Sequence, residues 1–453
     1  MIHNIVEEQR LYFLSEATKA YDTRMKALHK FKTCILGHEQ DILNALNQDL
    51  NKPPEEGYMT ELVMVLDELN FIMKHLSRWV KPVSVRASLA QMPAKCRIRM
   101  EPYGVVLIMA PWNYPFQLTM EPLIGAIAAG NCAVVKPSAY SPATSHIIRK
   151  IVEESFPASY VSVIEGGREQ NSALLSEKFD YIFFTGSVAV GKLVMESASR
   201  HLTPVSLELG GKSPCIVDES ADLALAAKRL VFGKYLNAGQ TCVAPDYLYV
   251  HEAVKSRFIE ELKSALGKAF PGYDYSTFTS IINDKHFTRI AALISGEQVL
   301  FGGHCDPVRR FIEPTILDHI SWESPVMQEE IFGPVLPVLS YNNLDAVIQA
   351  IQFHPRPLAT YLFTRDKAVE KQVLSRVSFG GGCINDTIMH LTTSHMGFGG
   401  VGESGMGNYH GKRSFDTFTH EKSIQIKGRF DMPFRFRPYT AKKSKILHHI
   451  FSK

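Results

Sequence analysis

From Gly104 onwards the chain alternates short apolar runs with segments long enough to form helices. Apolar runs of this length, rich in Val, Ile and Phe, are typical of strands that are buried on both faces. Strands joined through helices pair in parallel, and the helices cover both faces of the sheet. The pattern therefore predicts a doubly wound α/β fold, with strands near 104–109, 133–135, 160–164 and 181–184 and helices near 119–129, 142–156 and 188–200.

The segments that flank this pattern predict different structures. Residues 1–80 show apolar residues at helical spacing, which stops where Trp79-Val80-Lys81-Pro82 breaks the last helix. Arg97-Ile98-Arg99-Met100-Glu101 alternates charged and apolar residues, which indicates an exposed strand or hairpin. After residue 208 a second α/β segment is predicted, with strands near 215–217, 247–250, 335–339 and 359–363 and helices near 220–236 and 253–269.

Composition places the chain among ordinary globular proteins. Its 453 residues exceed what one hydrophobic core usually serves, so two or three domains are expected. The net charge of +3 is small for this length and gives no reason to expect nucleic acid as a partner. The seven cysteines are scattered without a CxxC pair, which argues against a disulfide framework and against a structural zinc site. No metal is expected.

The termini carry no targeting or membrane signal that we recognise. The first residues lack a basic region followed by an apolar core, and no stretch reaches the roughly 20 apolar residues of a membrane span. A reducing cytoplasm is therefore the expected location. The basic tail, residues 441–453, is weakly amphipathic and fits either a solvated tail or contact with an anionic membrane surface.

Three of the predicted strands end in residues suited to binding a nucleotide. The first leads into Trp112 and Asn113, the second into Lys136, and a later one into the glycine-containing segment 185–191, which opens a helix. Ligands of open parallel sheets bind beyond the carboxyl ends of the strands, and the start of a helix favours an anion. Gly397-Phe398-Gly399-Gly400-Val401-Gly402 also matches G-x-G-x-x-G, but lacks a buried strand before it, so we predict a flexible loop there.

Two residues stand out as candidates for catalysis. Cys242 lies in Asn237-Ala238-Gly239-Gln240-Thr241-Cys242-Val243-Ala244-Pro245, a run of small and polar residues just after a predicted helix. It fits either a nucleophilic thiol at a pocket or a small apolar filler. Glu208, between two leucines and beside Gly210-Gly211, fits either a desolvated general base or a surface carboxylate at a strand edge.

Four separated motifs resemble the signature segments of aldehyde dehydrogenases, in that family's order. They are Pro111-Trp112-Asn113, Leu207-Glu208-Leu209-Gly210-Gly211-Lys212, Gly239-Gln240-Thr241-Cys242 and Glu330-Ile331-Phe332-Gly333-Pro334. The resemblance covers nearly the whole chain. The class 3 branch is indicated by Pro245-Asp246-Tyr247, by the glycine-rich loop and by the absence of an N-terminal extension.

The resemblance implies a role for each catalytic residue. The Cys242 thiolate would attack the aldehyde carbonyl, and the Asn113 amide would join the Cys242 backbone N–H in holding the oxyanion. Hydride loss to the cofactor would leave a thioester, and Glu208 would activate the water that hydrolyses it. The implied cofactor is NAD or NADP, in contact with Trp112, Lys136, Gly186, Ser187, Gly191, Glu330 and Phe332.

One departure from the family pattern bears on the choice of cofactor. Many members carry a glutamate where this chain has Ala139, and that glutamate binds the adenosine ribose hydroxyls and repels a 2′-phosphate. Without it, we expect NADP to be used at least as well as NAD. A substrate pocket is expected at Tyr114, Tyr235, His395 and Phe398, which suits an apolar aldehyde, aliphatic (medium- or long-chain) or aromatic.

Other functions remain open from the sequence. A CoA-acylating enzyme of the same fold would pass the acyl group to CoA, although Glu208 would then have no water to activate. A cofactor-independent thiol esterase would need only Cys242 and Glu208. A non-catalytic protein on an enzyme fold would use neither.

The resemblance also implies a three-part organisation and a homodimer. Residues 1–80 and 102–207 would form the Rossmann-like cofactor domain, and residues 208–410 the catalytic domain. Residues 81–101 and 411–440 would form a small β bridging arm that pairs subunits and covers exposed strand edges.

Overall fold

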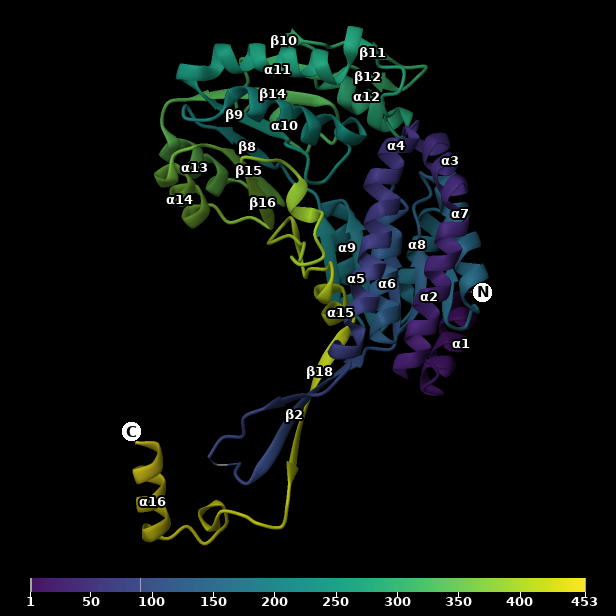
Figure 1. Ribbon diagram of the computed structural model, residues 1–453, viewed down its shortest axis with the longest axis vertical. Helices are drawn as coiled ribbons and strands as arrows, with labels where there is room; N and C mark the ends of the chain where they lie inside the picture. Colours follow the sequence, from purple (N-terminus) through teal and green to yellow (C-terminus); the bar gives the residue numbers. More distant parts are fainter. Residues whose placement is uncertain (1, 90, 453) are drawn as a thin grey trace.

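The computed structural model describes residues 2–89 and 91–452, which form two α/β units and a projecting arm (Figure 1). The first unit is built on a six-stranded sheet of order β17-β7-β6-β3-β4-β5, parallel except for β17. The predicted buried strands are confirmed in it. Its strands are β3 (Val105–Met109), β4 (Cys132–Lys136), β5 (Val161–Val163), β6 (Tyr181–Gly186), β7 (Val205–Leu209) and β17 (Gly405–Met406).

Helices cover this first sheet on both faces, as the alternation of apolar runs predicts (Figure 1). Pro142 begins α7, where a missing N–H costs nothing, and the Ser187 hydroxyl caps α9 by accepting a bond from the Val190 N–H. The helices are α1 (Ile2–Leu14), α2 (Tyr21–Gly37), α3 (Glu39–Leu50), α4 (Pro54–Gly57), the π-helical turn η1 (Tyr58–Leu62), α5 (Val63–Trp79), α6 (Gln117–Ala129), α7 (Pro142–Ser155), α8 (Arg168–Ser176), α9 (Val188–Ser199) and α15 (Lys412–Thr417).

The second unit contains a seven-stranded sheet of order β10-β13-β14-β9-β8-β15-β16, in which only β10 runs antiparallel to its neighbour. Its strands are β8 (Pro214–Val217), β9 (Tyr247–His251), β10 (Gln298–Phe301), β13 (Thr315–Asp318), β14 (Val335–Tyr341), β15 (Ala359–Phe363) and β16 (Gly381–Ile384). Its helices are α10 (Leu223–Tyr235), α11 (Lys255–Ala269), α12 (Asp284–Ala292), α13 (Leu344–Phe353) and α14 (Lys367–Arg376), and β11 (Cys305–Asp306) pairs with β12 (Phe311–Ile312).

The short 3-10 turns that join these elements are η2 (Leu236–Gly239), η3 (Glu252–Val254), η4 (Pro271–Tyr273), η5 (Pro325–Met327), η6 (Met389–Leu391) and η7 (Pro433–Arg435). The segment 397–402 is a loop between antiparallel bridges, which confirms that its glycines do not open a helix.

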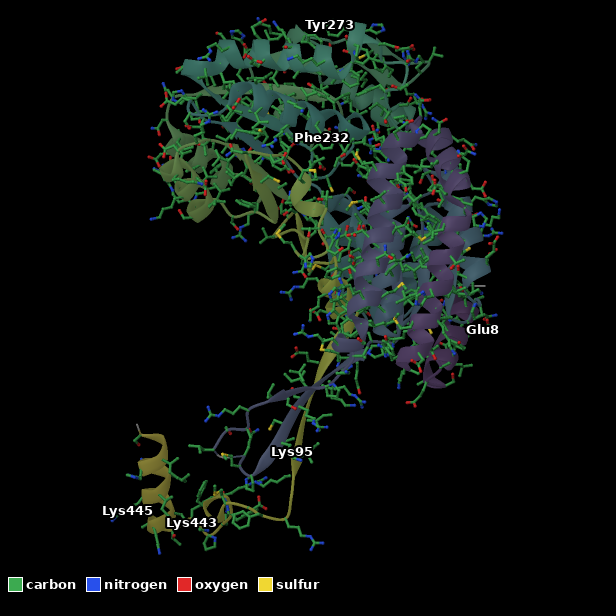
Figure 2. All side chains as sticks on the ribbon, viewed as in Figure 1. Glu8, Lys95, Phe232, Tyr273, Lys443 and Lys445 are labelled. Carbon is green, nitrogen blue, oxygen red and sulfur yellow. The ribbon has the colours of Figure 1, made fainter. Side chains whose placement is uncertain are left out.

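A three-stranded antiparallel sheet, β1-β2-β18, forms the arm that leaves both α/β units (Figure 1). It consists of β1 (Val83–Val85), β2 (Ala94–Pro102) and β18 (Thr419–Lys427), and the side chains of β2 alternate between half-buried and exposed over most of its length. The exposed strand predicted around residues 97–101 is thereby confirmed. Near the far end of the arm lies α16 (Ala441–Phe451), on which Lys445 is exposed and Lys443 is half-buried (Figure 2).

The chain crosses between units at places that sequence patterns do not mark. β17 lies within the range 208–410 but pairs with β7 of the first sheet, and α15 lies beyond residue 410 but packs on α6. Among the described residues, no helix is both long enough and apolar enough to cross a membrane.

Candidate active site

A cavity of about 430 Å³ lies beyond the carboxyl ends of the first sheet, where that sheet faces the second unit. Residues after β3, β6 and β7 line one side of it, and loops of the second unit line the other. This is the place where parallel sheets bind ligands. The structure brings together eight of the residues that the sequence singles out: Trp112, Asn113, Gly186, Ser187, Glu208, Cys242, Glu330 and Phe332.

Cys242 follows a strained turn that ends α10. Asn237 and Ala238 have φ of 53° and 51°, in the left-handed region that non-glycine residues seldom adopt. The turn is held from the first unit, because the Glu56 carboxylate accepts a 2.9 Å bond from the Asn237 N–H. Asn237 in turn donates through Nδ2 to the Asn113 carbonyl at 2.8 Å. The position of the thiol is therefore fixed by contacts that cross between the units.

The Cys242 thiol is half-buried and protonated in the protein alone. Burial, with a smaller contribution from the nearby carboxyls of Glu330 and Glu208, raises its pKa to about 12. A thiol is a weak nucleophile until it loses its proton. The site must therefore supply a proton acceptor or a positive charge when substrate and cofactor bind.

Asn113 is buried beside the thiol loop and donates through Nδ2 to the Gln240 carbonyl at 3.0 Å. This bond aims its amide at the segment that carries Cys242. An amide nitrogen has two N–H donors, so it can also serve an oxygen that becomes negative during a reaction.

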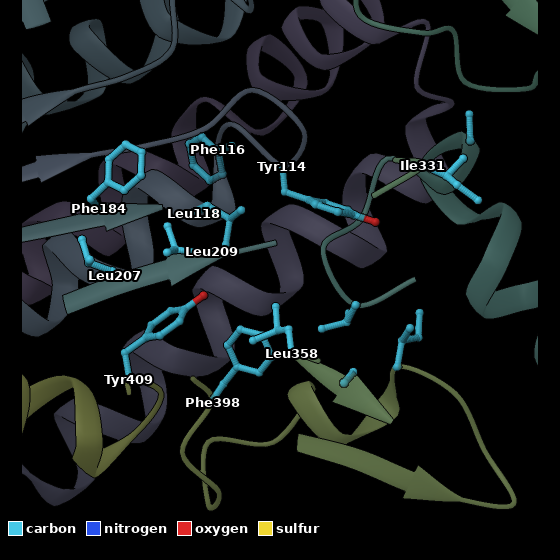
Figure 3. Packing of buried hydrophobic residues seen from close by; sticks show 14 of the residues in the cluster. Tyr114, Phe116, Leu118, Phe184, Leu207, Leu209, Ile331, Leu358, Phe398 and Tyr409 are labelled. Carbon is cyan, nitrogen blue, oxygen red and sulfur yellow. The ribbon is translucent and has the colours of Figure 1, made fainter. Parts of the chain in front are cut away.

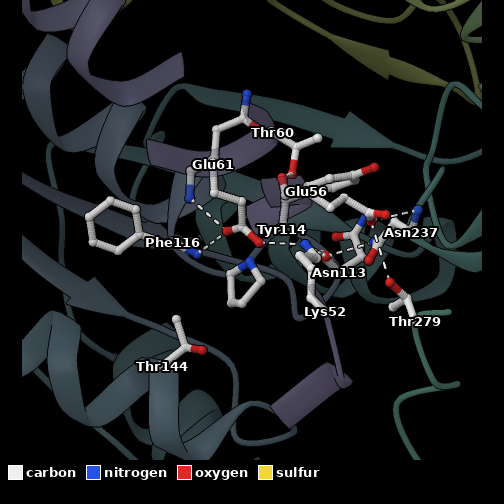
Figure 4. A network of polar contacts seen from close by, with 12 residues as sticks. Lys52, Glu56, Thr60, Glu61, Asn113, Tyr114, Phe116, Thr144, Asn237 and Thr279 are labelled. Carbon is white, nitrogen blue, oxygen red and sulfur yellow. Dashed lines mark hydrogen bonds and ion pairs between the residues drawn. The ribbon is translucent and has the colours of Figure 1, made fainter. Parts of the chain in front are cut away.

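Behind Asn113 lies a buried ion pair that the sequence did not indicate (Figure 4). Lys52 and Glu61 are fully buried, and Nζ of Lys52 lies 2.5 Å from Glu61 Oε1 and 3.3 Å from the Asn113 carbonyl. The second Glu61 oxygen accepts the Phe116 N–H at 2.8 Å. The pair thus holds the backbone on both sides of Tyr114. Nothing around Lys52, in Asn51-Lys52-Pro53, distinguishes it from an exposed lysine.

Glu208 lies on β7 and is buried, so the reading as a surface carboxylate at a strand edge is wrong. Across residues 2–89 and 91–452, no hydrogen-bond partner reaches either of its carboxyl oxygens. Burial raises its pKa well above the usual range, because a buried carboxyl without partners favours its neutral form. A raised pKa makes the carboxylate form a stronger base, and Glu208 lines the cavity, so it suits a general base once it is ionised.

The segment Glu330-Ile331-Phe332 is held by the loop after β7 and by the segment that precedes β9. A Cβ on Gly210 would collide with the Glu330 carboxyl, so only glycine allows this approach. Asp246, in an ion pair with Lys212, accepts the Ile331 N–H at 2.8 Å. Burial raises the pKa of Glu330 to about 8. Phe332 has φ of 50°, and its ring meets that of Trp112 edge-on at 5.3 Å.

Two predicted cofactor residues lie outside this cavity. Lys136, at the end of β4, is buried and donates to the Pro137 carbonyl at 2.7 Å, and burial lowers its pKa to about 8. Gly191, inside α9, packs on Leu209, whose side chain would collide with a Cβ at that position. Here glycine allows the helix to approach the sheet.

On its other side, Cys242 lines a second cavity of about 180 Å³ with an apolar wall. Figure 3 shows four of the side chains that line it, Tyr114, Leu118, Phe398 and Tyr409. Cys242 and Leu118 line both cavities. Two of the four predicted substrate residues, Tyr114 and Phe398, lie there. Leu236, which the sequence also suggested for an apolar pocket, lines it too. Its other lining side chains include residues that the sequence patterns did not indicate: Met59, Met64, Phe232, Ile388, Met389, Leu391 and Tyr409.

The structure does not bring the other two predicted substrate residues to this cavity. Tyr235 does not line this cavity, although Phe232 and Leu236 do, and its hydroxyl lies 3.4 Å from the Thr315 carbonyl. His395 is exposed and rests edge-on against Phe71 at 4.9 Å.

A thiol between a polar cavity at the strand ends and an apolar cavity suits an oxidoreductase that binds its cofactor on one side and its substrate on the other. A sequence model described as the aldehyde dehydrogenase family matches residues 2–424. The chain belongs to this family. It is an NAD(P)-dependent aldehyde dehydrogenase, which confirms the fold class and the oxidation of an aldehyde that the sequence predicted.

The chain is similar over almost its whole length to several known proteins. It is 48% identical to 4,4′-diaponeurosporen-aldehyde dehydrogenase of Staphylococcus aureus, over 97% of this chain and 98% of that one. It is 42% identical to the dimeric NADP-preferring aldehyde dehydrogenase of the dog (Canis lupus familiaris), over 94% of each chain. A solved structure described as the substrate-bound state of Staphylococcus aureus AldH superimposes with a TM-score of 0.97 at 47% identity, covering 99% of each chain.

Proposed function

We propose that this aldehyde dehydrogenase oxidises apolar aldehydes through a thioester on Cys242, with the cofactor in the polar cavity and the substrate chain in the apolar one. The observation that carries the proposal is the position of Cys242, which lines both cavities. An aldehyde whose chain fills the apolar side would place its carbonyl carbon at the sulfur.

The polar cavity fits a dinucleotide. The free N–H groups at the start of α9, with Gly186 and Ser187, suit a pyrophosphate. Phe332 and Trp112 offer aromatic faces near the thiol, and the Glu330 carboxyl can accept bonds from a ribose. When bound, oxidised NAD(P) supplies a positively charged ring that accepts hydride.

The residues of the chain would carry out the other steps. The Cys242 sulfur attacks the aldehyde carbon and loses its proton to water, giving a thiohemiacetal. Asn113 Nδ2 and the Cys242 N–H hold the oxyanion while hydride leaves the carbon, and a thioester remains on the sulfur. Glu208 then takes a proton from water, whose oxygen attacks the thioester and releases the carboxylic acid and the thiol.

Three outcomes separate this function from its rivals. Absorbance of reduced cofactor should rise with aldehyde and NAD(P) alone, and free acid should form in equal amount. Turnover that requires CoA would favour the acylating enzyme, and ester hydrolysis without aldehyde oxidation would favour the esterase. A Cys242→Ala variant should lose at least about 10⁴-fold in turnover. Cys383→Ser, outside both cavities, serves as the matched control.

NADP should serve at least as well as NAD. Ala139 is exposed just after β4, where many family members place a glutamate. The dog enzyme, 42% identical, is named NADP-preferring, which supports this proposal. Comparing kcat/KM for the two cofactors tests it, and a clear preference for NAD would contradict it.

We also propose a cytoplasmic homodimer. The arm of β1, β2 and β18 leaves strand edges and apolar side chains such as Val83 and Ile426 exposed, as a partner-binding surface would. Light scattering should give twice the 50.8 kDa of one chain. A monomer that retains full activity would contradict the assignment of the arm.

A further inference from the structure

A third cavity, of about 890 Å³, adjoins the apolar cavity at Cys242. It lies between α10 and α11, with an apolar wall that includes Val231, Ala265 and Phe278. Phe232 and Leu236 line both this cavity and the apolar one. We call it the distal cavity.

The two cavities are neighbours along two elements of the chain. The segment that contains α4 and η1 contributes Glu56 to the distal cavity and then Met59 to the apolar one. The end of α10 contributes Phe232 and Leu236 to both. The Phe232 side chain, labelled in Figure 2, is 38% exposed, which is unusual for a large aromatic residue inside a packed wall. A dividing side chain with free space beside it can change rotamer and join the two spaces.

Size decides what can bind in the apolar cavity alone. A methylene group is about the size of a water molecule and occupies roughly 30 Å³. The 180 Å³ of the apolar cavity therefore holds a chain of about six carbon atoms. The chain of any longer aldehyde must leave this cavity. The distal cavity, nearly five times larger, begins at the side chains that close it.

Two of the polar groups that line the distal cavity are already engaged. The Glu56 carboxylate accepts the Asn237 N–H, and the Tyr235 hydroxyl lies within reach of the Thr315 carbonyl. Charges of both signs, on Lys228, Glu261 and Lys268, are also among its lining residues. Most of its lining side chains are nevertheless apolar, so the cavity suits an apolar chain.

We propose that the distal cavity is a binding site for the far end of a long, unbranched apolar aldehyde, and that Phe232 divides it from the reacting end. This rests on the proposed function, because the head of the same molecule lies at Cys242. It makes Phe232 a specificity-determining residue: short aldehydes use the apolar cavity alone, whereas longer ones need both.

Kinetics with straight-chain aldehydes of four to sixteen carbons test the proposal, each kept below its solubility limit. In the parent enzyme, kcat/KM should keep rising beyond about eight carbons, by up to about fourfold for each buried methylene. Ala265→Trp, which fills the distal cavity, should lower kcat/KM at least tenfold for chains of twelve carbons or more. It should change kcat/KM for butanal and hexanal less than twofold. Ser264→Trp, on the exposed side of α11, is the matched control and should leave both unchanged.

Leu225→Glu provides a second route, in case Ala265→Trp does not fold. Leu225 lines the distal cavity and is 38% exposed, so a charge there keeps the core intact but disfavours an apolar chain. It should show the same selective loss with long aldehydes. Equal losses at all chain lengths, or no loss with either variant, would overturn the distal site. Failure of the parent enzyme to oxidise even hexanal would instead contradict the proposed function.

Discussion

The two cavities that meet at Cys242 differ in how they are built. The polar cavity holds Glu208 and Glu330, whose pKa values burial raises, and backbone contacts such as Gly210 against Glu330 fix its shape. The apolar cavity is closed by side chains, and three of them are the flexible residues Met59, Met64 and Met389. The polar cavity is suited to holding the reacting groups in fixed positions, and the apolar cavity to accepting substrates of varied shape. Changes on the polar side should therefore affect every aldehyde alike.

Replacing Glu208 with Gln should have the largest effect of those on the polar side. Without a base for the water, kcat should fall about 10²–10⁴-fold, while one equivalent of reduced cofactor still forms rapidly per site. Stopped-flow absorbance measures both. A steady rate with no initial burst would show that hydrolysis is not the step that Glu208 serves.

The same variant should change the pH dependence in a defined direction. The raised pKa of Glu208 means that the native state keeps its proton when the unfolded state, with a pKa near 4.5, has lost it. The parent should therefore lose stability as pH rises above about 4.5, by up to about 1.4 kcal/mol per unit of pKa difference. Glu208→Gln should flatten this slope in denaturant unfolding and remove the rise of activity with pH.

Asn113→Ala should lower kcat about 10²–10³-fold for short and long aldehydes alike, because the oxyanion loses one donor. KM should change only slightly. Asn113→Asp, which keeps the shape but removes the N–H donors, should behave similarly. If the loss grows with chain length, Asn113 contributes to the apolar side, and the separation of the two cavities fails.

Lys52→Met tests the buried ion pair with Glu61 and the contact of Lys52 with the Asn113 carbonyl. Leaving Glu61 buried without its partner should lower the free energy of unfolding by about 3–5 kcal/mol. Adding Glu61→Gln should recover part of that stability, yet kcat should stay about tenfold low because the Asn113 carbonyl still lacks its Lys52 contact. Lys255→Met, which breaks the pair with Asp318, is the control and should leave kcat unchanged. Full recovery of kcat in the double variant would make the pair purely structural.

Ala139→Glu should have the smallest effect, confined to the cofactor. Restoring a carboxylate at this exposed position should shift the ratio of kcat/KM toward NAD by about tenfold, through repulsion of the 2′-phosphate. Ala158→Glu adds the same charge elsewhere on the surface as a control. An unchanged ratio would place the adenosine ribose away from residue 139.

Sequence patterns predicted the polar side far better than the apolar one. Strand ends and glycines mark Asn113, Gly186 and Glu208, because their positions follow from the backbone of a parallel sheet. The apolar wall combines segments hundreds of residues apart. Whether Phe232 or Tyr235 lines it depends on how the end of α10 is rotated against those segments, and no local sequence pattern indicates that rotation. The burial of Lys52 is equally invisible, since it depends on the contact with Glu61.

The hydrogen bonds that join the two units around Cys242, such as that from Asn113 to the Gln240 carbonyl, have a consequence for partly unfolded molecules. Asn113 and Glu208 belong to the first sheet, and Cys242 and Glu330 to the second unit, so the reactive centre exists only while the two units are docked. A molecule in which the units have separated keeps its helices but loses its chemistry. As denaturant increases, turnover should disappear before circular dichroism changes, which makes activity a sensitive report on assembly.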